Sequence, residues 1–150
     1  MTARLDFAAA SPEAYKALLA LTTSIKRFGI EPKLLHLIHL RASQLNGCAY
    51  CVDMHVREAL HDGETQQRLH LLVSWRESSL YSETERAVLA WAEALTLLPQ
   101  TQAPDADYER LKSFYSDADM VKLTTAIAQI NTWNRLCVGF RSQHPVENAA

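Results

Sequence analysis

The stretch NGCAYCVDMH, residues 46–55, connects two helical segments and holds two of the three cysteines of the chain. Its Asn-Gly pair favours a break in the backbone, so we expect one helix to end there and another to begin at the cysteines. At about 100° per residue, Cys48, Cys51 and His55 fall within an arc of about 60° on the second helix. The spacing therefore predicts that the three side chains share one face.

Helix signals continue on both sides of this stretch. Caps, prolines and an apolar period of three to four residues predict helices over residues 12–28, 32–45, 48–61, 64–76, 83–98, 107–116 and 117–140. The candidate core residues of the fourth helix are Leu69, Leu72, Val73 and Trp75. No alternation of apolar and polar residues is long enough for a strand. The sequence predicts an all-α fold, a single-domain helical bundle of six or seven helices over residues 1–150.

Composition limits the classes of function. The chain has 150 residues, a net charge of −2 and no run of basic residues, so we expect no nucleic-acid partner. The longest uncharged run, residues 123–134, contains Thr, Gln and Asn and is too short for a bilayer, so no membrane association is expected. The N-terminal residues do not form a signal-peptide pattern. We therefore expect a cytoplasmic protein whose three cysteines do not form a disulfide scaffold.

The spacing of the cysteines leaves three interpretations open. A haem attachment site is excluded because Val52, and not histidine, follows the second cysteine. A structural zinc site needs a fourth ligand, for which Cys137 or the His36/His39 pair of the preceding helix would have to serve. A redox-active dithiol and a set of ordinary packing residues are the other two interpretations. Cys137 itself, in the apolar part of the last helix, is predicted to be a buried packing thiol.

A longer segment resembles a known family. LRASQLNGCAYC, residues 40–51, and the following Asp53-Met54-His55 resemble the signature of the alkylhydroperoxidase D-like branch of the carboxymuconolactone decarboxylase superfamily. Residues 75–96 and 130–141 are similar to the same family, so the resemblance covers about residues 30–141. It implies an all-helical fold, a homo-oligomer that is a trimer or hexamer, and a peroxidase that uses no haem, flavin or metal.

The resemblance also assigns roles to residues. Cys51 would attack a small organic hydroperoxide as a thiolate and become a sulfenic acid, and Cys48 would condense with it to a disulfide. An external dithiol reductant would then restore the pair by exchange. His55 would be the base that activates Cys51, which agrees with its place one helical turn further on.

The sequence departs from the family pattern at two positions. Members often carry a glutamate 12 residues before the first cysteine, where this chain has His36, and some carry a histidine where this chain has Tyr50. His36 has two interpretations. It could replace the glutamate in the proton relay, because histidine exchanges protons near neutral pH although it lacks the carboxylate charge, or it could be a half-buried polar residue on the face of an amphipathic helix. The alternative functions are a carboxymuconolactone decarboxylase-type lyase, which does not rely on a cysteine pair, and a non-catalytic dithiol or metal-binding redox module.

Overall fold

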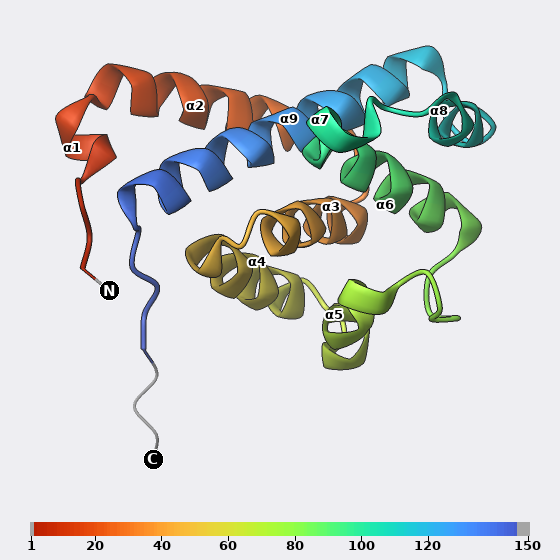
Figure 1. Ribbon diagram of the computed structural model, residues 1–150, viewed down its shortest axis with the longest axis horizontal. Helices are drawn as coiled ribbons and strands as arrows, with labels where there is room; N and C mark the ends of the chain where they lie inside the picture. Colours follow the sequence, from red (N-terminus) through yellow and green to blue (C-terminus); the bar gives the residue numbers. More distant parts are fainter. Residues whose placement is uncertain (1, 147–150) are drawn as a thin grey trace.

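The computed structural model describes residues 2–146, which form nine α-helices and one 3-10 helix without any strand (Figure 1). The elements are α1 (Phe7–Ala10), α2 (Pro12–Ile25), α3 (Pro32–Leu45), α4 (Ala49–His61), α5 (Gln66–Leu71), η1 (Leu72–Ser74), α6 (Glu83–Thr96), α7 (Leu98–Thr101), α8 (Asp105–Lys112) and α9 (Asp117–Phe140). The predicted all-α class is confirmed. The predicted number of helices was too low because α1 and α7 have four residues each, too few to show a helical period.

The helix boundaries follow local signals in the sequence. Ser82 and Glu85 form the predicted capping box, in which each side chain accepts a hydrogen bond from the backbone of the other residue. The predicted helix over residues 64–76 is instead divided into α5 and the 3-10 helix η1. The core assignment of Val73 was wrong, since its side chain is 57% exposed. A 3-10 turn advances about 120° per residue, and this extra rotation carries Val73 away from the core.

Helix α3 lies at the centre of the molecule and packs against α4, α6 and α9 (Figure 1). Its side chains enter two hydrophobic clusters. One contains Ile38 with residues of α6, α8 and α9, and the other contains Leu37 and Leu40 with residues of α4, α5 and α6. Full burial of one such side chain stabilises the fold by roughly 1.5–3 kcal/mol. The two clusters together fix α4 and α9 on neighbouring sides of α3.

A half-buried charged network connects α3 to α6. Arg41 Nε donates to Glu93 Oε1 at 2.7 Å, and Trp75 Nε1 donates to the same oxygen at 2.8 Å. Burial of the Glu93 carboxyl opposes its ionisation, but the hydrogen bonds from Trp75, Arg76 and Arg41 outweigh burial and lower the pKa of Glu93. The network has a structural role, since it joins α3 to α6 through Glu93.

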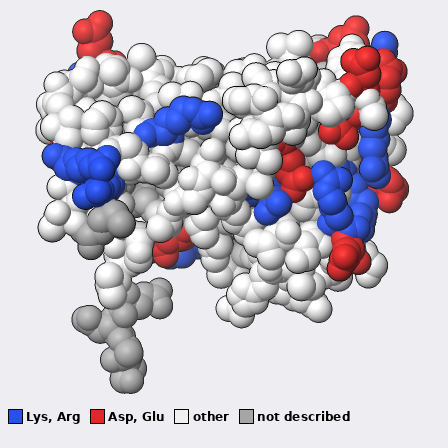
Figure 2. All heavy atoms as spheres, viewed as in Figure 1, with Lys and Arg blue, Asp and Glu red and all other residues white. Residues whose placement is uncertain are grey.

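The surface is mixed in charge. Figure 2 shows that acidic and basic side chains on this face gather together toward the end formed by α6 and α8, while most of the remaining surface is uncharged. None of the helices found in residues 2–146 has the length and apolar character needed to cross a membrane.

An open groove of about 490 Å³ lies where α6, α8 and α9 meet, lined in part by Trp91, Tyr108 and Met120. The expected homo-oligomer stays a prediction.

Candidate active site

The turn between α3 and α4 has the break that the sequence predicts. Gly47 has φ of +64°, a left-handed conformation that glycine adopts without strain. The backbone N–H of Cys48 then donates to the carbonyl of Ser43 at 3.0 Å. Cys48 is the N-cap of α4, with φ of −87° and ψ of 91°, and the helix begins at Ala49. The prediction that Cys48 lies within the helix was therefore wrong by one residue.

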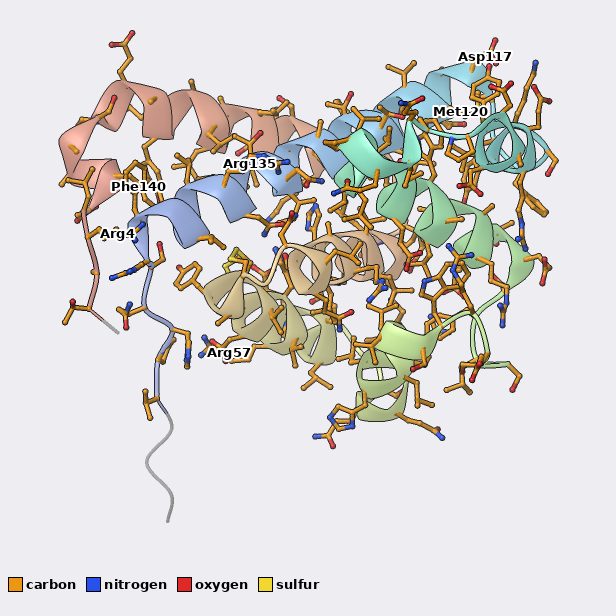
Figure 3. All side chains as sticks on the ribbon, in the orientation of Figure 1. Arg4, Arg57, Asp117, Met120, Arg135 and Phe140 are labelled. Carbon is orange, nitrogen blue, oxygen red and sulfur yellow. A yellow bond between two sulfur atoms is a disulfide. The ribbon has the colours of Figure 1, made fainter. Side chains whose placement is uncertain are left out.

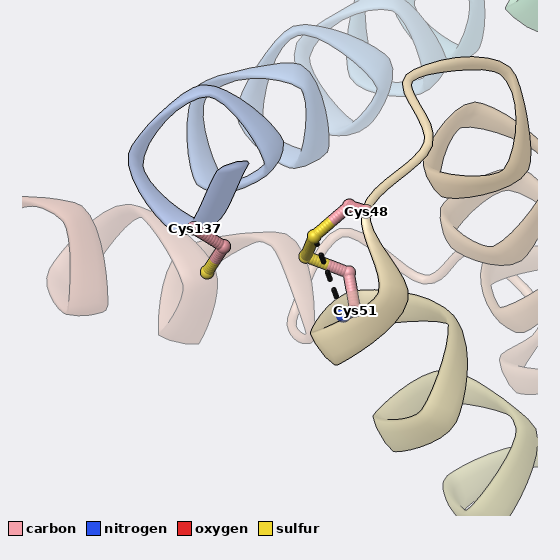
Figure 4. A group of neighbouring side chains, drawn as sticks. All are labelled: Cys48, Cys51 and Cys137. Carbon is pink, nitrogen blue, oxygen red and sulfur yellow. Dashed lines mark hydrogen bonds between the residues drawn. A yellow bond between two sulfur atoms is a disulfide. The ribbon is translucent and has the colours of Figure 1, made fainter. Parts of the chain in front are cut away.

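Cys48 and Cys51 form a disulfide across this first turn (Figure 4). Their Cα atoms are 5.3 Å apart, within the usual range for the bond. The backbone N–H of Cys51 points to Cys48 Sγ at 3.3 Å, so one of the free amides at the start of α4 faces sulfur. Both cysteines are only 1% exposed. The spacing thus predicted the pairing correctly, although Cys48 reaches Cys51 from the cap and not from a helical position.

Helix α9 is fixed to the same turn by amide side chains. Asn46 Nδ2 donates to the side-chain oxygens of Asn131 and Asn134, both at 2.9 Å. Asn134 Nδ2 in turn donates to Ser43 Oγ at 2.9 Å. Residues three apart lie on one face of a helix, and the next position in this series is Cys137. The hydrogen bonds therefore place the Cys137 side of α9 over the disulfide.

The three cysteines form one buried cluster. Their sulfur atoms all lie within 4.8 Å of one another, with Cys137 facing the disulfide from α9 (Figure 4). Burial raises the pKa of the Cys137 thiol, which therefore favours its protonated form. The prediction of a buried thiol is confirmed, since Cys137 is 5% exposed. Sequence reasoning considered Cys137 beside the pair only as a possible zinc ligand, although the 131–134–137 series was a usable signal for the contact.

The N-terminal segment covers this cluster. Phe7 and Tyr50 pack against the three sulfurs. Arg4 lies beside the end of α9 near Phe140 (Figure 3), where its backbone N–H donates to the Phe140 carbonyl at 2.9 Å and its Nη1 donates to the Gly139 carbonyl at 3.0 Å. The surroundings of the sulfurs are therefore mainly apolar.

His55 lies one helical turn after Cys51 and is also buried, at 5% exposure. Its Nδ1 is hydrogen-bonded to Glu58 Oε2 at 2.9 Å, and this bond lowers the pKa of Glu58. When Glu58 is ionised, Nδ1 carries the proton and Nε2 is left with a lone pair. Within residues 2–146, the buried Nε2 has no hydrogen-bond partner. The arrangement prepares Nε2 to accept a proton.

The histidines of α3 take different positions. His36, the residue predicted for the relay, is hydrogen-bonded through Nε2 to Asp62 Oδ2 at 2.8 Å. That bond is the main cause of the lowered pKa of Asp62. His39 instead contacts the ring of His55 in a tilted arrangement, with ring centroids 4.8 Å apart and an angle of 44° between the ring planes. Burial, followed by the charge of a protonated His55, lowers the pKa of His39 well below its usual value.

The carboxylates of this region were not foreseen from the sequence. Glu58 is three residues after His55, a spacing at which helical side chains meet. That spacing could have identified the pair in advance. Asp62 could not have been found in this way, because its contact with His36 depends on how α3 packs against the end of α4.

The cysteines are also the group best placed for a metal in the part of the chain that the structure describes. Their sulfurs are the one set of three or more metal-ligating atoms found close enough together there. A structural zinc site takes four ligands, so this set alone is incomplete for zinc. The expectation of no resident metal stays a prediction.

Known proteins resemble this chain over most of its length. The profile of the carboxymuconolactone decarboxylase family matches residues 12–94. The uncharacterized protein YdfG of Bacillus subtilis is 38% identical over 138 residues, which are 92% of this chain and 94% of that protein. A crystal structure from Agrobacterium tumefaciens shares 53% identity at a TM-score of 0.95, covering 97% of this chain and all of the other. That protein is of unknown function and has been suggested to be the antioxidant defence protein AhpD.

A more distant structure shows the fold alone. The debrominase Bmp8 is 24% identical at a TM-score of 0.84, over 92% of this chain and 74% of that protein. The helical arrangement is therefore shared by proteins with different activities, and the fold does not identify a reaction.

Proposed function

Because this chain belongs to the carboxymuconolactone decarboxylase family and to its alkylhydroperoxidase D-like members, we propose that it is a thiol-dependent peroxidase for small organic hydroperoxides. The observation that carries the proposal is the buried Cys48–Cys51 disulfide at the start of α4, with His55 one turn further along. A cysteine pair is the element that a peroxidase needs and that a decarboxylase-type lyase does not.

The proposed chemistry has three steps: attack on the peroxide, disulfide formation and reduction by a dithiol. The Cys51 thiolate attacks the O–O bond of a hydroperoxide, which yields Cys51 sulfenic acid and, after uptake of a proton, an alcohol. The Cys48 thiol then condenses with the sulfenic acid to form the disulfide and release water. An external dithiol reduces this disulfide by exchange and leaves as its own disulfide. The helix dipole favours negative charge at the start of α4, and the backbone N–H of Cys51 faces Cys48 Sγ, so the direct stabilisation of a thiolate applies to Cys48.

His55 is the proposed general base. Its Nε2 takes the proton of the Cys51 thiol and returns it to the alkoxide that leaves. Glu58, bonded to Nδ1, would stabilise the imidazolium that forms between the two transfers. His36 stays the fourth member of the proposed catalytic set. Its bond to Asp62 supports this role, since Asp62 supplies the carboxylate charge that histidine lacks.

The compartment follows from the reductant. The cycle needs a supply of dithiol, which a reducing compartment provides, and we therefore propose the cytoplasm. The nature of the dithiol is open, because both cysteines are buried and a reductant must first gain access to them.

A steady-state assay tests the proposal directly. Wild-type protein should consume cumene hydroperoxide only when a dithiol is present, and peptide mass spectrometry should find the Cys48–Cys51 disulfide after the dithiol is exhausted. Protein that is oxidised once but does not turn over with any of several dithiols would instead be a redox module. No oxidation of either cysteine would reject the peroxidase.

A further inference from the structure

Cys137 is a free, buried thiol that lies beside the disulfide. Its Sγ lies within 4.8 Å of both sulfurs of the disulfide, although it comes from a distant part of the sequence. It is 5% exposed and shares the apolar contacts of Phe7 and Tyr50 with the pair. A thiol held against a disulfide in this way has two covalent partners within reach.

The remaining gap is small. A disulfide bond is about 2 Å long, so one sulfur must approach another by less than about 3 Å. Rotation of a cysteine side chain between its staggered positions moves the sulfur by a comparable distance. Helix α9 supplies a fixed base for that rotation, because Asn131 and Asn134 hold it to the turn before Cys48.

We propose that Cys137 is a second resolving thiol, which forms a disulfide with Cys51 when Cys48 does not. The inference rests on the proposed function, in which Cys51 becomes the sulfenic acid. The Cys137 thiol condenses with that sulfenic acid, forms the Cys51–Cys137 bond and releases water. Starting from the existing disulfide, the Cys137 thiolate attacks Cys51 Sγ, and Cys48 leaves as a thiolate. The second route needs no further oxidant.

A second resolving thiol has a chemical benefit. A sulfenic acid that stays uncapped is open to further oxidation to the sulfinic acid, which most proteins cannot reverse. Cys137 would prevent this further oxidation whenever Cys48 has already formed another bond or points away from Cys51. An incoming dithiol would then reduce the Cys51–Cys137 bond by exchange, as it reduces the Cys48–Cys51 bond.

Two variants test the proposal with matched chemistry. Cys48→Ser removes the first resolving thiol, and Cys48→Ser/Cys137→Ser removes both. After one equivalent of cumene hydroperoxide, followed by dimedone, Cys48→Ser should contain a Cys51–Cys137 disulfide by peptide mass spectrometry. The double variant should carry several-fold more dimedone on Cys51, because nothing is left to condense with the sulfenic acid.

A second oxidant separates this inference from the peroxidase. Diamide joins two neighbouring thiols without any hydroperoxide. A Cys51–Cys137 bond formed with diamide alone would support Cys137 and count against the peroxidase. Equal dimedone labelling of both variants, with no cross-link under either oxidant, would overturn the inference and leave the peroxidase standing.

Wild-type protein gives an independent measurement if Cys48→Ser does not fold. Oxidised protein is quenched in acid, alkylated and mapped for the position of its free thiol. Alkylated Cys48 beside a Cys51–Cys137 bridge in a fraction of the molecules would support the exchange route. Label confined to Cys137 in all of them would match the Cys48–Cys51 disulfide alone and contradict the exchange route.

Discussion

The two ends of the site differ in charge, although one helix carries both. At the start of α4, the cluster of Cys48, Cys51 and Cys137 is packed by aromatic side chains. One turn later, the histidine region contains His55, which is hydrogen-bonded to the Glu58 carboxylate and lies against the ring of His39. The attack on a peroxide would occur at the cysteine end, whereas proton transfer would occur at the histidine end.

Because of this difference, α4 has to stabilise a thiolate at one end and accept its proton at the other. Apolar burial disfavours a thiolate, as the raised pKa of Cys137 shows. At the sulfur end, the amide of Cys51 faces Cys48 Sγ and the helix dipole adds to its effect. The proton of Cys51 must leave for a group that can stabilise positive charge, and His55 with Glu58 is such a group. Separate substitutions at the two ends should therefore give different kinetic defects.

The largest effect is expected from Cys51→Ser. A serine hydroxyl is not ionised near neutral pH and cannot attack the O–O bond, so peroxide consumption should fall to the rate without enzyme. Cys48→Ser is the matched control, because it retains the attacking thiol and should still reduce the first equivalent of peroxide. Stopped-flow measurement of peroxide loss distinguishes the two. If Cys51→Ser still turned over, the attacking thiol would be Cys48 and not Cys51.

His55→Ala should give the next largest defect. Loss of a general base lowers a rate by roughly 10²–10⁴-fold, and the defect should appear in sulfenic acid formation, before resolution. The rate should recover in part at high pH, where hydroxide removes the thiol proton. Arg57→Ala is a suitable control, since Arg57 is exposed and pairs with Asp53. Equal rates for His55→Ala and Arg57→Ala would exclude His55 as the base.

His39 should affect stability toward acid. In the unfolded chain His39 takes up a proton near pH 6.5. In the folded protein it stays neutral at that pH, because burial lowers its pKa. Stability is thus fully present above pH 6.5 and falls as the pH drops toward the folded pKa, by about 1.4 kcal/mol per pH unit at most. His39→Leu should remove this slope. Urea unfolding of both proteins at pH 8 and pH 5.5 measures it, and the pH 8 difference reports packing alone. Parallel curves would contradict the prediction.

Sequence patterns predicted the parts of this site that lie within one helix. The Asn-Gly break, the disulfide of Cys48 with Cys51 and the place of His55 all follow from spacing along α4. The contacts of Cys137, and of His36 with Asp62, join elements that are far apart in the chain. They depend on how α3 and α9 pack against α4. Periodicity within α9 puts Asn131, Asn134 and Cys137 on one face but does not say which element that face meets.

The smallest effect is expected at His36, which acts furthest from sulfur. If His36 with Asp62 belongs to the proposed proton relay, His36→Ala should slow the reaction less than His55→Ala, because it removes a later proton transfer. His36→Glu should leave activity equal or higher, provided that its carboxylate is not repelled by Asp62. Asp62→Asn removes the charge while keeping the size of the side chain, and should resemble His36→Ala.

The pH profile decides between a relay and a structural contact. A relay defect should change kcat across pH 5 to 8, since proton transfer limits the rate over part of that range. A lost contact at the α3–α4 interface should lower the unfolding midpoint and leave the profile of the remaining folded enzyme unchanged. Wild-type activity of His36→Ala at every pH from 5 to 8 would remove His36 from the catalytic set. The proton of His55 would then have to pass to water or to another side chain, since burial and the charge of His55 lower the pKa of His39.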